Sequence, residues 1–147
     1  MDLTLQKPGE HHFIHSVSSD GIRVVDQVCR KSLIVSARQL ITGWPVDSPE
    51  QLTARHLDQI LELQPELVLL GTGERQVFLA PELLMVFYRQ SVGVEVMTTQ
   101  AACRTFNVLV SEDRNVVAAL IQGKAVRQGL QKPSRSDPDQ DMKGSSS

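Results

Sequence analysis

Apolar runs separated by short polar segments predict that strands and helices alternate through the second half of the chain. The central run, residues 67–70, follows Pro65 and leads directly into Gly71-Thr72-Gly73. A short continuous apolar run that ends at glycine is typical of a strand buried on both faces of a sheet. The run is also far shorter than an average helix. We expect the sheet to assemble around this strand.

The segments after this strand continue the alternation. Pro81 and Glu82 suit a helix start, because proline fits the first turn and a carboxylate there interacts favourably with the helix dipole. A strand at residues 94–97 follows, then a helix that starts at Thr98 or Thr99, and a last strand at 116–121. This order predicts parallel strands joined by right-handed crossovers, with helices covering the sheet. The apolar sides of the two helices are Leu83, Leu84, Phe87 and Tyr88 in the first, and Ala102, Phe106 and Leu109 in the second.

The first half predicts antiparallel strands and one helix. Strand patterns at 13–17 and 22–25 flank Asp20-Gly21, a pair that signals a hairpin because both central residues of a type I′ turn need positive φ. A third strand at 33–35 and a weaker one at 40–44 follow. A helix then starts after the N-cap residue Thr53, with its apolar positions at Leu57, Ile60 and Leu61.

These patterns together predict one α/β domain over residues 13–122. It has three layers: a mixed sheet, with an N-terminal antiparallel hairpin and a parallel βαβαβ second half, and helices on the sheet faces. Residues 1–12 form a loose, polar lead-in. Residues 123–147 contain no aromatic residue, and they cannot bury enough apolar area to offset the entropy of ordering. We expect a disordered polar tail there.

Composition excludes several classes of function. The 147 residues suffice for one domain with a proper core, and a net charge of −2 provides no electrostatic footprint for nucleic acid. The longest apolar runs, such as 83–88, are too short for membrane insertion, and the N-terminus lacks the apolar core of a signal peptide. Cys29 and Cys103 form neither a disulfide framework nor a zinc motif, which favours a cytoplasmic location.

The loop Gly71-Thr72-Gly73 has two interpretations. A dinucleotide fingerprint would need glycine at Gln76 and a helix starting inside the motif, and a Walker A pattern is absent as well. One interpretation is a tight exit from a buried strand, where glycine avoids strain. The other is binding of an oxyanion or carboxylate by the loop amides.

Four polar residues near the start of the last helix form a second candidate group. Thr98 and Thr99 follow a strand that neighbours Gly71, so they are either helix caps or part of a binding edge. Arg104 and Asn107 are three positions apart and share a side of the helix. For Arg104 the alternatives are contact with an anion at the strand ends or pairing with a nearby carboxylate. For Asn107 they are a surface amide or a hydrogen bond to a nearby loop.

The thiols and histidines supply no catalytic pattern. Cys103 lies near the start of a helix beside Arg104, where a thiolate would be stabilised. No histidine is near it in sequence, so a small buried residue is the better interpretation. We predict that neither cysteine is a catalytic nucleophile. The histidines show no metal-binding spacing, and we predict no metal site.

Several segments resemble a small domain family of unknown function found in bacteria and archaea. The resemblance rests on Ser-Leu-Ile-Val-Ser at 32–36, Trp44, the segment from Pro65 to Gly73 and, most distinctively, residues 93–109. It covers about residues 10–123, and Phe106 stands where many relatives have tyrosine. Eukaryotic relatives of this family include mitochondrial respiratory complex I assembly factor 3 and the adipogenesis-associated cytosolic domain protein.

This resemblance implies a three-layer α/β domain and, from the mitochondrial relative, an assembly role through partner proteins. It implies no established reaction, cofactor or catalytic residue. We therefore expect a non-catalytic binding or assembly module. The alternative is an enzyme, or a binder of a small anionic ligand, that uses the Gly71–Gly73 and Thr98–Thr99 loops. Glu74 is the only acid near those loops, so no general base is evident.

Overall fold

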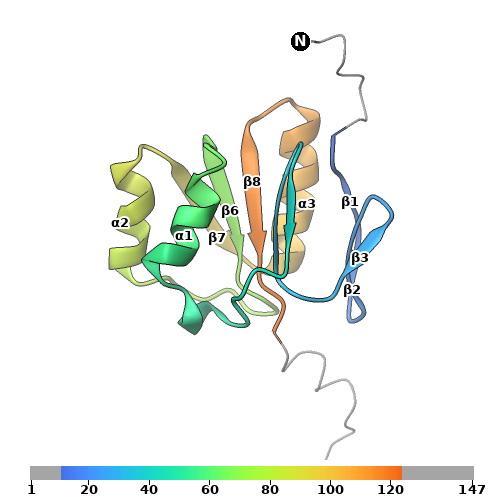
Figure 1. Cartoon of the computed structure of the whole chain (residues 1–147), viewed down its shortest axis with the longest axis horizontal. Coiled ribbons are helices and arrows are strands. Elements are labelled where there is room, and N and C mark those ends of the chain that lie inside the picture. Colours follow the sequence, from blue (N-terminus) through green and yellow to red (C-terminus); the bar gives the residue numbers. More distant parts are fainter. Residues whose placement is uncertain (1–10, 124–147) are drawn as a thin grey trace, which may run out of the picture.

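A mixed five-stranded sheet forms the centre of the computed structural model, which describes residues 11–123 (Figure 1). The strand order is β5-β4-β8-β6-β7. β4 pairs antiparallel with both β5 and β8, whereas β6 pairs parallel with both β7 and β8. The last strand therefore occupies the middle of the sheet. The bounds are β4 (Leu33–Ser36), β5 (Leu40–Thr42), β6 (Leu67–Gly71), β7 (Gly93–Met97) and β8 (Val116–Leu120).

The second half has the predicted βαβαβ order. Helix α2 (Pro81–Arg89) connects β6 to β7, and helix α3 (Thr99–Ser111) connects β7 to β8. Because β6, β7 and β8 are parallel, their carboxyl ends lie on one edge of the sheet. α3 starts at that edge, directly after β7.

A separate three-stranded antiparallel sheet precedes the main one. Its strands are β1 (Ile14–Ser18), β2 (Gly21–Val24) and β3 (Gln27–Cys29), in that order. The predicted hairpin forms, but its turn lies one residue earlier than expected. Ser18 pairs with Gly21, so the connecting residues are Ser19 and Asp20. Gly21, with φ +135°, is instead needed because a Cβ there would lie 2.6 Å from the Cys29 carbonyl oxygen.

The two faces of the main sheet carry separate cores. One face packs against α3 and the small sheet, in a cluster that includes Ile22, Leu69, Phe106 and Ala118. The other packs against helix α1 (Ala54–Leu61), α2 and the loop around Trp44, with a short 3₁₀ turn at Pro49–Gln51 before α1. Strand β8 supplies Val116, Ala118 and Leu120 to the first core, and Val117 and Ala119 to the second. This period of two is what a strand buried on both faces requires.

The predicted fold class is confirmed as a three-layer α/β arrangement with a mixed sheet and helices on both faces (Figure 1). The hairpin belongs to the layer that contains α3. One helix position was assigned wrongly: Tyr88 is 57% exposed, because Leu83, Leu84 and Phe87 already fill the side of α2 that faces the sheet. Residues 1–10 and the predicted disordered tail beyond Gly123 lie outside the described residues.

Candidate functional site

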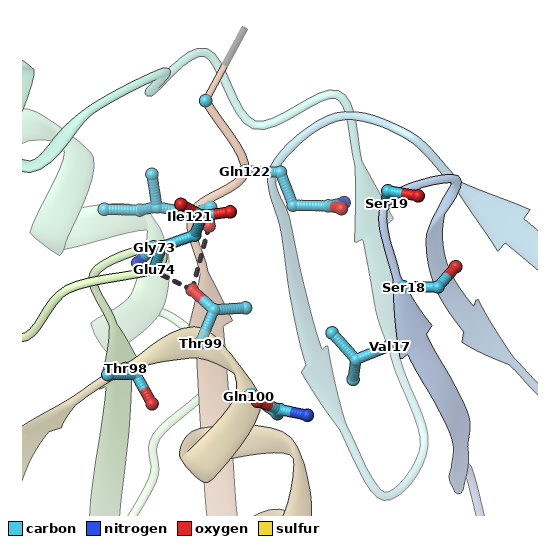
Figure 2. Close-up of a pocket in the computed structure, with 11 residues that line it drawn as sticks. Val17, Ser18, Ser19, Gly73, Glu74, Thr98, Thr99, Gln100, Ile121 and Gln122 are labelled. Carbon is cyan, nitrogen blue, oxygen red and sulfur yellow. Dashed lines mark hydrogen bonds between the residues drawn. The ribbon is translucent and has the colours of Figure 1, made fainter. Parts of the chain in front are cut away.

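A cavity of about 340 Å³ lies at the carboxyl edge of the parallel strands. Figure 2 shows the turn between β1 and β2 on one side, and the start of α3 with the ends of β6 and β8 on the other. The small sheet thus closes a site that the main sheet alone would leave open. The lining residues are Val17, Ser18, Ser19, Gly73, Glu74, Thr98, Thr99, Gln100, Ile121, Gln122 and Gly123.

Gly71 allows β6 to end directly against α3. A Cβ at this position would lie 2.7 Å from the Thr99 Cα and 2.9 Å from its Oγ1. Real side chains do not tolerate such distances to a backbone atom, so only glycine permits this approach. Gly71 is therefore a packing residue beneath the cavity rather than part of its lining.

The amides of the Gly71–Gly73 loop already have partners within the chain. The Thr72 N–H donates to the Met97 carbonyl at 2.9 Å, and the Gly73 N–H donates to Thr99 Oγ1 at 2.8 Å. The Thr72 hydroxyl donates to the Arg75 carbonyl at 2.6 Å. This loop has the geometry of a tight exit from a buried strand, the first of its two interpretations.

Thr98 and Thr99 both hold the start of α3 in place. Thr98 is the N-cap, and its side-chain oxygen accepts from the Ala101 N–H at 3.2 Å. Thr99 is 6% exposed. Its hydroxyl donates to the Ile121 carbonyl at 2.9 Å while accepting from Gly73, so it joins the ends of β6 and β8 (Figure 2).

Arg104 and Asn107 lie outside the cavity lining. The Asn107 amide is occupied on both sides: its Oδ1 accepts from the Ile14 N–H at 2.9 Å, and its Nδ2 donates to the Ile14 carbonyl at 2.8 Å. These two bonds fasten β1 to α3 across 93 residues of sequence. Arg104 is exposed one turn beyond Gln100 on the same helix. The structure thus brings Gly73, Thr98 and Thr99 to the cavity, and binding at this edge stays a prediction.

Sequence reasoning missed several residues that complete the cavity lining. Ser18 and Ser19 come from the β1–β2 turn, and no local pattern shows that this turn folds back over the sheet edge. Gln122 follows β8, where its Nε2 donates to the carbonyls of Cys29 and Lys31, both at 2.8 Å. A polar residue directly after a long apolar strand was the one available signal.

Both thiols are buried and neither has the environment of an activated nucleophile. Burial raises the pKa of Cys103 to about 12, and the Arg104 charge offsets only part of this increase. Burial also raises the pKa of Cys29. Within residues 11–123, no group of three or more His, Cys, Asp or Glu side chains could hold a metal ion. No helix in the same range is long and apolar enough to cross a membrane.

We expect Cys103 in the folded protein to react with iodoacetamide far more slowly than the unfolded thiol, because only the thiolate attacks. The measurement is the alkylation rate against pH, in a Cys29→Ser variant, with the urea-unfolded chain as the control. Stability should fall above the unfolded pKa of about 8.5, because the unfolded state then loses a proton that the folded state keeps up to about pH 12. An apparent pKa below the unfolded value would contradict this prediction.

Known proteins share this fold and much of this sequence. A solved protein of Xanthomonas campestris is 36% identical with a TM-score of 0.74, over 92% of this chain and 98% of that one. The 13 kDa major membrane protein of Francisella tularensis subsp. holarctica (strain LVS) is 37% identical over 90 residues, which are 60% of this chain and 73% of that protein.

A further relative is NADH dehydrogenase (ubiquinone) 1 alpha subcomplex assembly factor 3 of Xenopus tropicalis. It is 36% identical over 120 residues, 80% of this chain, but these span only 64% of the frog protein. The profile of a family described as "Protein of unknown function (DUF498/DUF598)" matches residues 14–121. This range includes both sheets and all three α-helices of the described structure. The chain therefore belongs to the DUF498/DUF598 family.

Proposed function

We propose that this protein is a non-catalytic binding or assembly module, and that the cavity edge is its contact surface for partner proteins. The observation that carries the proposal is the 36% identity, over 80% of the chain, to a protein named as an assembly factor. The family match spans every strand and helix around the cavity. Most of the cavity edge therefore lies within the part of the chain that defines the family.

The roles of the polar residues at this edge support binding over catalysis. Thr98 and Thr99 make hydrogen bonds that hold the start of α3 and the ends of β6 and β8 together. Glu74 is the only titratable side chain among the described lining residues. General acid–base catalysis commonly uses a second side chain that holds the acid or base in position, and no other titratable residue of the described lining is present to do this for Glu74.

The second candidate function, an enzyme or a binder of a small anionic ligand, is favoured by the cavity itself. Its volume of about 340 Å³ falls at the lower end of ligand pockets, roughly 300–1,000 Å³. Against it, the Thr72 and Gly73 amides, which would bind an anion, already donate within the chain. A cytoplasmic location remains a prediction.

The test is affinity purification of the tagged full chain from its native cells, with the rim of the cavity filled. Ser19 and Gln100 line the cavity from opposite sides, and no hydrogen bond of either side chain is seen within the described structure. A Ser19→Tyr/Gln100→Tyr variant should therefore keep the fold. Gln90→Tyr is the matched control, because Gln90 is exposed at the far end of α2, on the other face of the sheet.

We expect the wild type and the control to capture the same partners, and the double variant to lose at least one of them by about tenfold in yield. Unchanged capture by the double variant would overturn the proposed contact surface. A metabolite bound at this cavity, found by screening the purified wild type, would support the second candidate function instead.

A further inference from the structure

The cavity has a distinct electrostatic character. Of its eleven lining residues, Glu74 alone is charged, and none carries a positive charge. Glu74 is exposed and forms no ion pair with any residue in the range 11–123. A full negative charge at the wall, without a cation to neutralise it, disfavours an anionic occupant and favours a cationic one.

Hydrogen bonding at the end of the neighbouring strand β8 points to the same class of ligand. The Gln122 Nε2 donates to two carbonyls, Cys29 and Lys31, so the direction of the amide is fixed. Its Oε1 is then an acceptor held in place, and Figure 2 shows the amide extending toward Ser18 and Ser19. Two acceptors within one small cavity suit a group that has several N–H donors.

Among the described residues that line the cavity, the start of α3 is the one feature that would favour an anion, because Arg75 and Arg104 lie outside the lining. A helix N-terminus carries about half an elementary positive charge, less than the full charge of Glu74. Its donors are also largely occupied: the Thr99 N–H donates to the Gly73 carbonyl at 2.9 Å, and the Ala101 N–H to Thr98 Oγ1. Among the groups that line the cavity, the Glu74 carboxylate therefore carries the largest charge.

We propose that this cavity binds the guanidinium or ammonium group of an arginine or lysine side chain presented by a partner protein. The inference rests on the proposed function and names the chemistry of its contact. A cavity of about 340 Å³ holds one long side chain. Glu74 pairs with the cation, and Gln122 Oε1 and the Ser19 hydroxyl accept the remaining N–H donors.

The test is an NMR titration of the isotope-labelled full chain. The probe is the capped peptide Gly-Arg-Gly, and its match is the same peptide with citrulline, a neutral isostere of arginine. We expect saturable shifts at the amides of Glu74, Thr98, Gln100 and Gln122 with the arginine peptide. The dissociation constant should rise roughly three- to fivefold for the citrulline peptide and for Glu74→Gln, the ratio expected when an exposed ion pair is lost. Glu82→Gln, an exposed carboxylate at the start of α2, should change nothing.

Equal affinity for the citrulline peptide, no effect of Glu74→Gln, or saturable shifts at the same amides with inorganic phosphate would each overturn the inference. Agmatine is a small molecule with a guanidinium group, so it distinguishes a free metabolite from a protein side chain as the source of that group. Binding of agmatine as tightly as the peptide would overturn the assignment to a partner side chain. Failure of the titration alone leaves the contact surface standing, because the tyrosine variants block the cavity by bulk and keep its charge.

Discussion

Replacing Phe106 by alanine is expected to lower the free energy of unfolding by about 3–5 kcal/mol, the usual cost of removing a buried aromatic side chain. Phe106 is fully buried on α3, in the core that joins the small sheet, α3 and the main sheet. Its loss leaves a cavity between layers that are each fixed by their own hydrogen bonds, so little collapse can follow. Urea denaturation measures the change.

Val108→Ala is the matched control for this substitution, because Val108 lies on the same helix and is 55% exposed. Its effect should stay within about 0.5 kcal/mol. If Phe106→Ala lowers the free energy of unfolding by less than about 1 kcal/mol, the core around α3 is not tightly packed. The free energy of unfolding of a domain is commonly about 5–15 kcal/mol. A loss of the expected size would therefore make the variant unfold at a much lower urea concentration than the wild type.

Gly71→Ala is expected to destabilise the protein by about 1–3 kcal/mol, the usual cost of overpacking. The added methyl would lie 2.7 Å from the Thr99 Cα, a backbone atom that cannot rotate away. The start of α3 must then move, which weakens the two hydrogen bonds of the Thr99 hydroxyl. Thermal unfolding measures the loss of stability, and the amide shifts of Gly73 and Ile121 report the movement.

Gly93→Ala provides the contrast, because it lies at the opposite end of the neighbouring strand. A methyl there makes a tight contact only with the Leu67 Cδ1 at 3.3 Å, the end of a flexible side chain, and lies at an ordinary 3.7 Å from the Glu66 carbonyl oxygen. We expect a change within about 1 kcal/mol of either sign, since alanine also restricts the unfolded chain. Equal destabilisation by the two substitutions would contradict the role given to Gly71.

The elements of the main sheet could be predicted because their signals are local. A continuous apolar run between Pro65 and Gly71 is enough to indicate β6, and Pro81 marks the start of α2. Strand β3 was not predicted, because it has three residues of which only Cys29 is buried. The hairpin turn was placed one residue late, because the sequence does not show that Gly21 is required by its contact with β3.

The site was only half predictable for a related reason. Gly73, Thr98 and Thr99 follow strands, so the parallel topology alone brings them to one edge. Asn107 was predicted to be a surface amide or to bond to a nearby loop, but its partner Ile14 is 93 residues away and has no signature of its own. Hydrogen bonds between a side chain and a distant backbone leave no periodic trace in the sequence, and the far wall of the cavity depends on them.

The central position of β8 has a consequence for synthesis of the protein on the ribosome. Neither β4 nor β6 pairs with the other, and each depends on β8 for its inner partner. The chain must therefore be made as far as residue 120 before the two halves of the sheet can join. Until then, the apolar strands made earlier have open edges, and nascent chains in this condition are prone to aggregation. A ribosome stalled shortly before Val116 would thus hold a chain that needs chaperone protection.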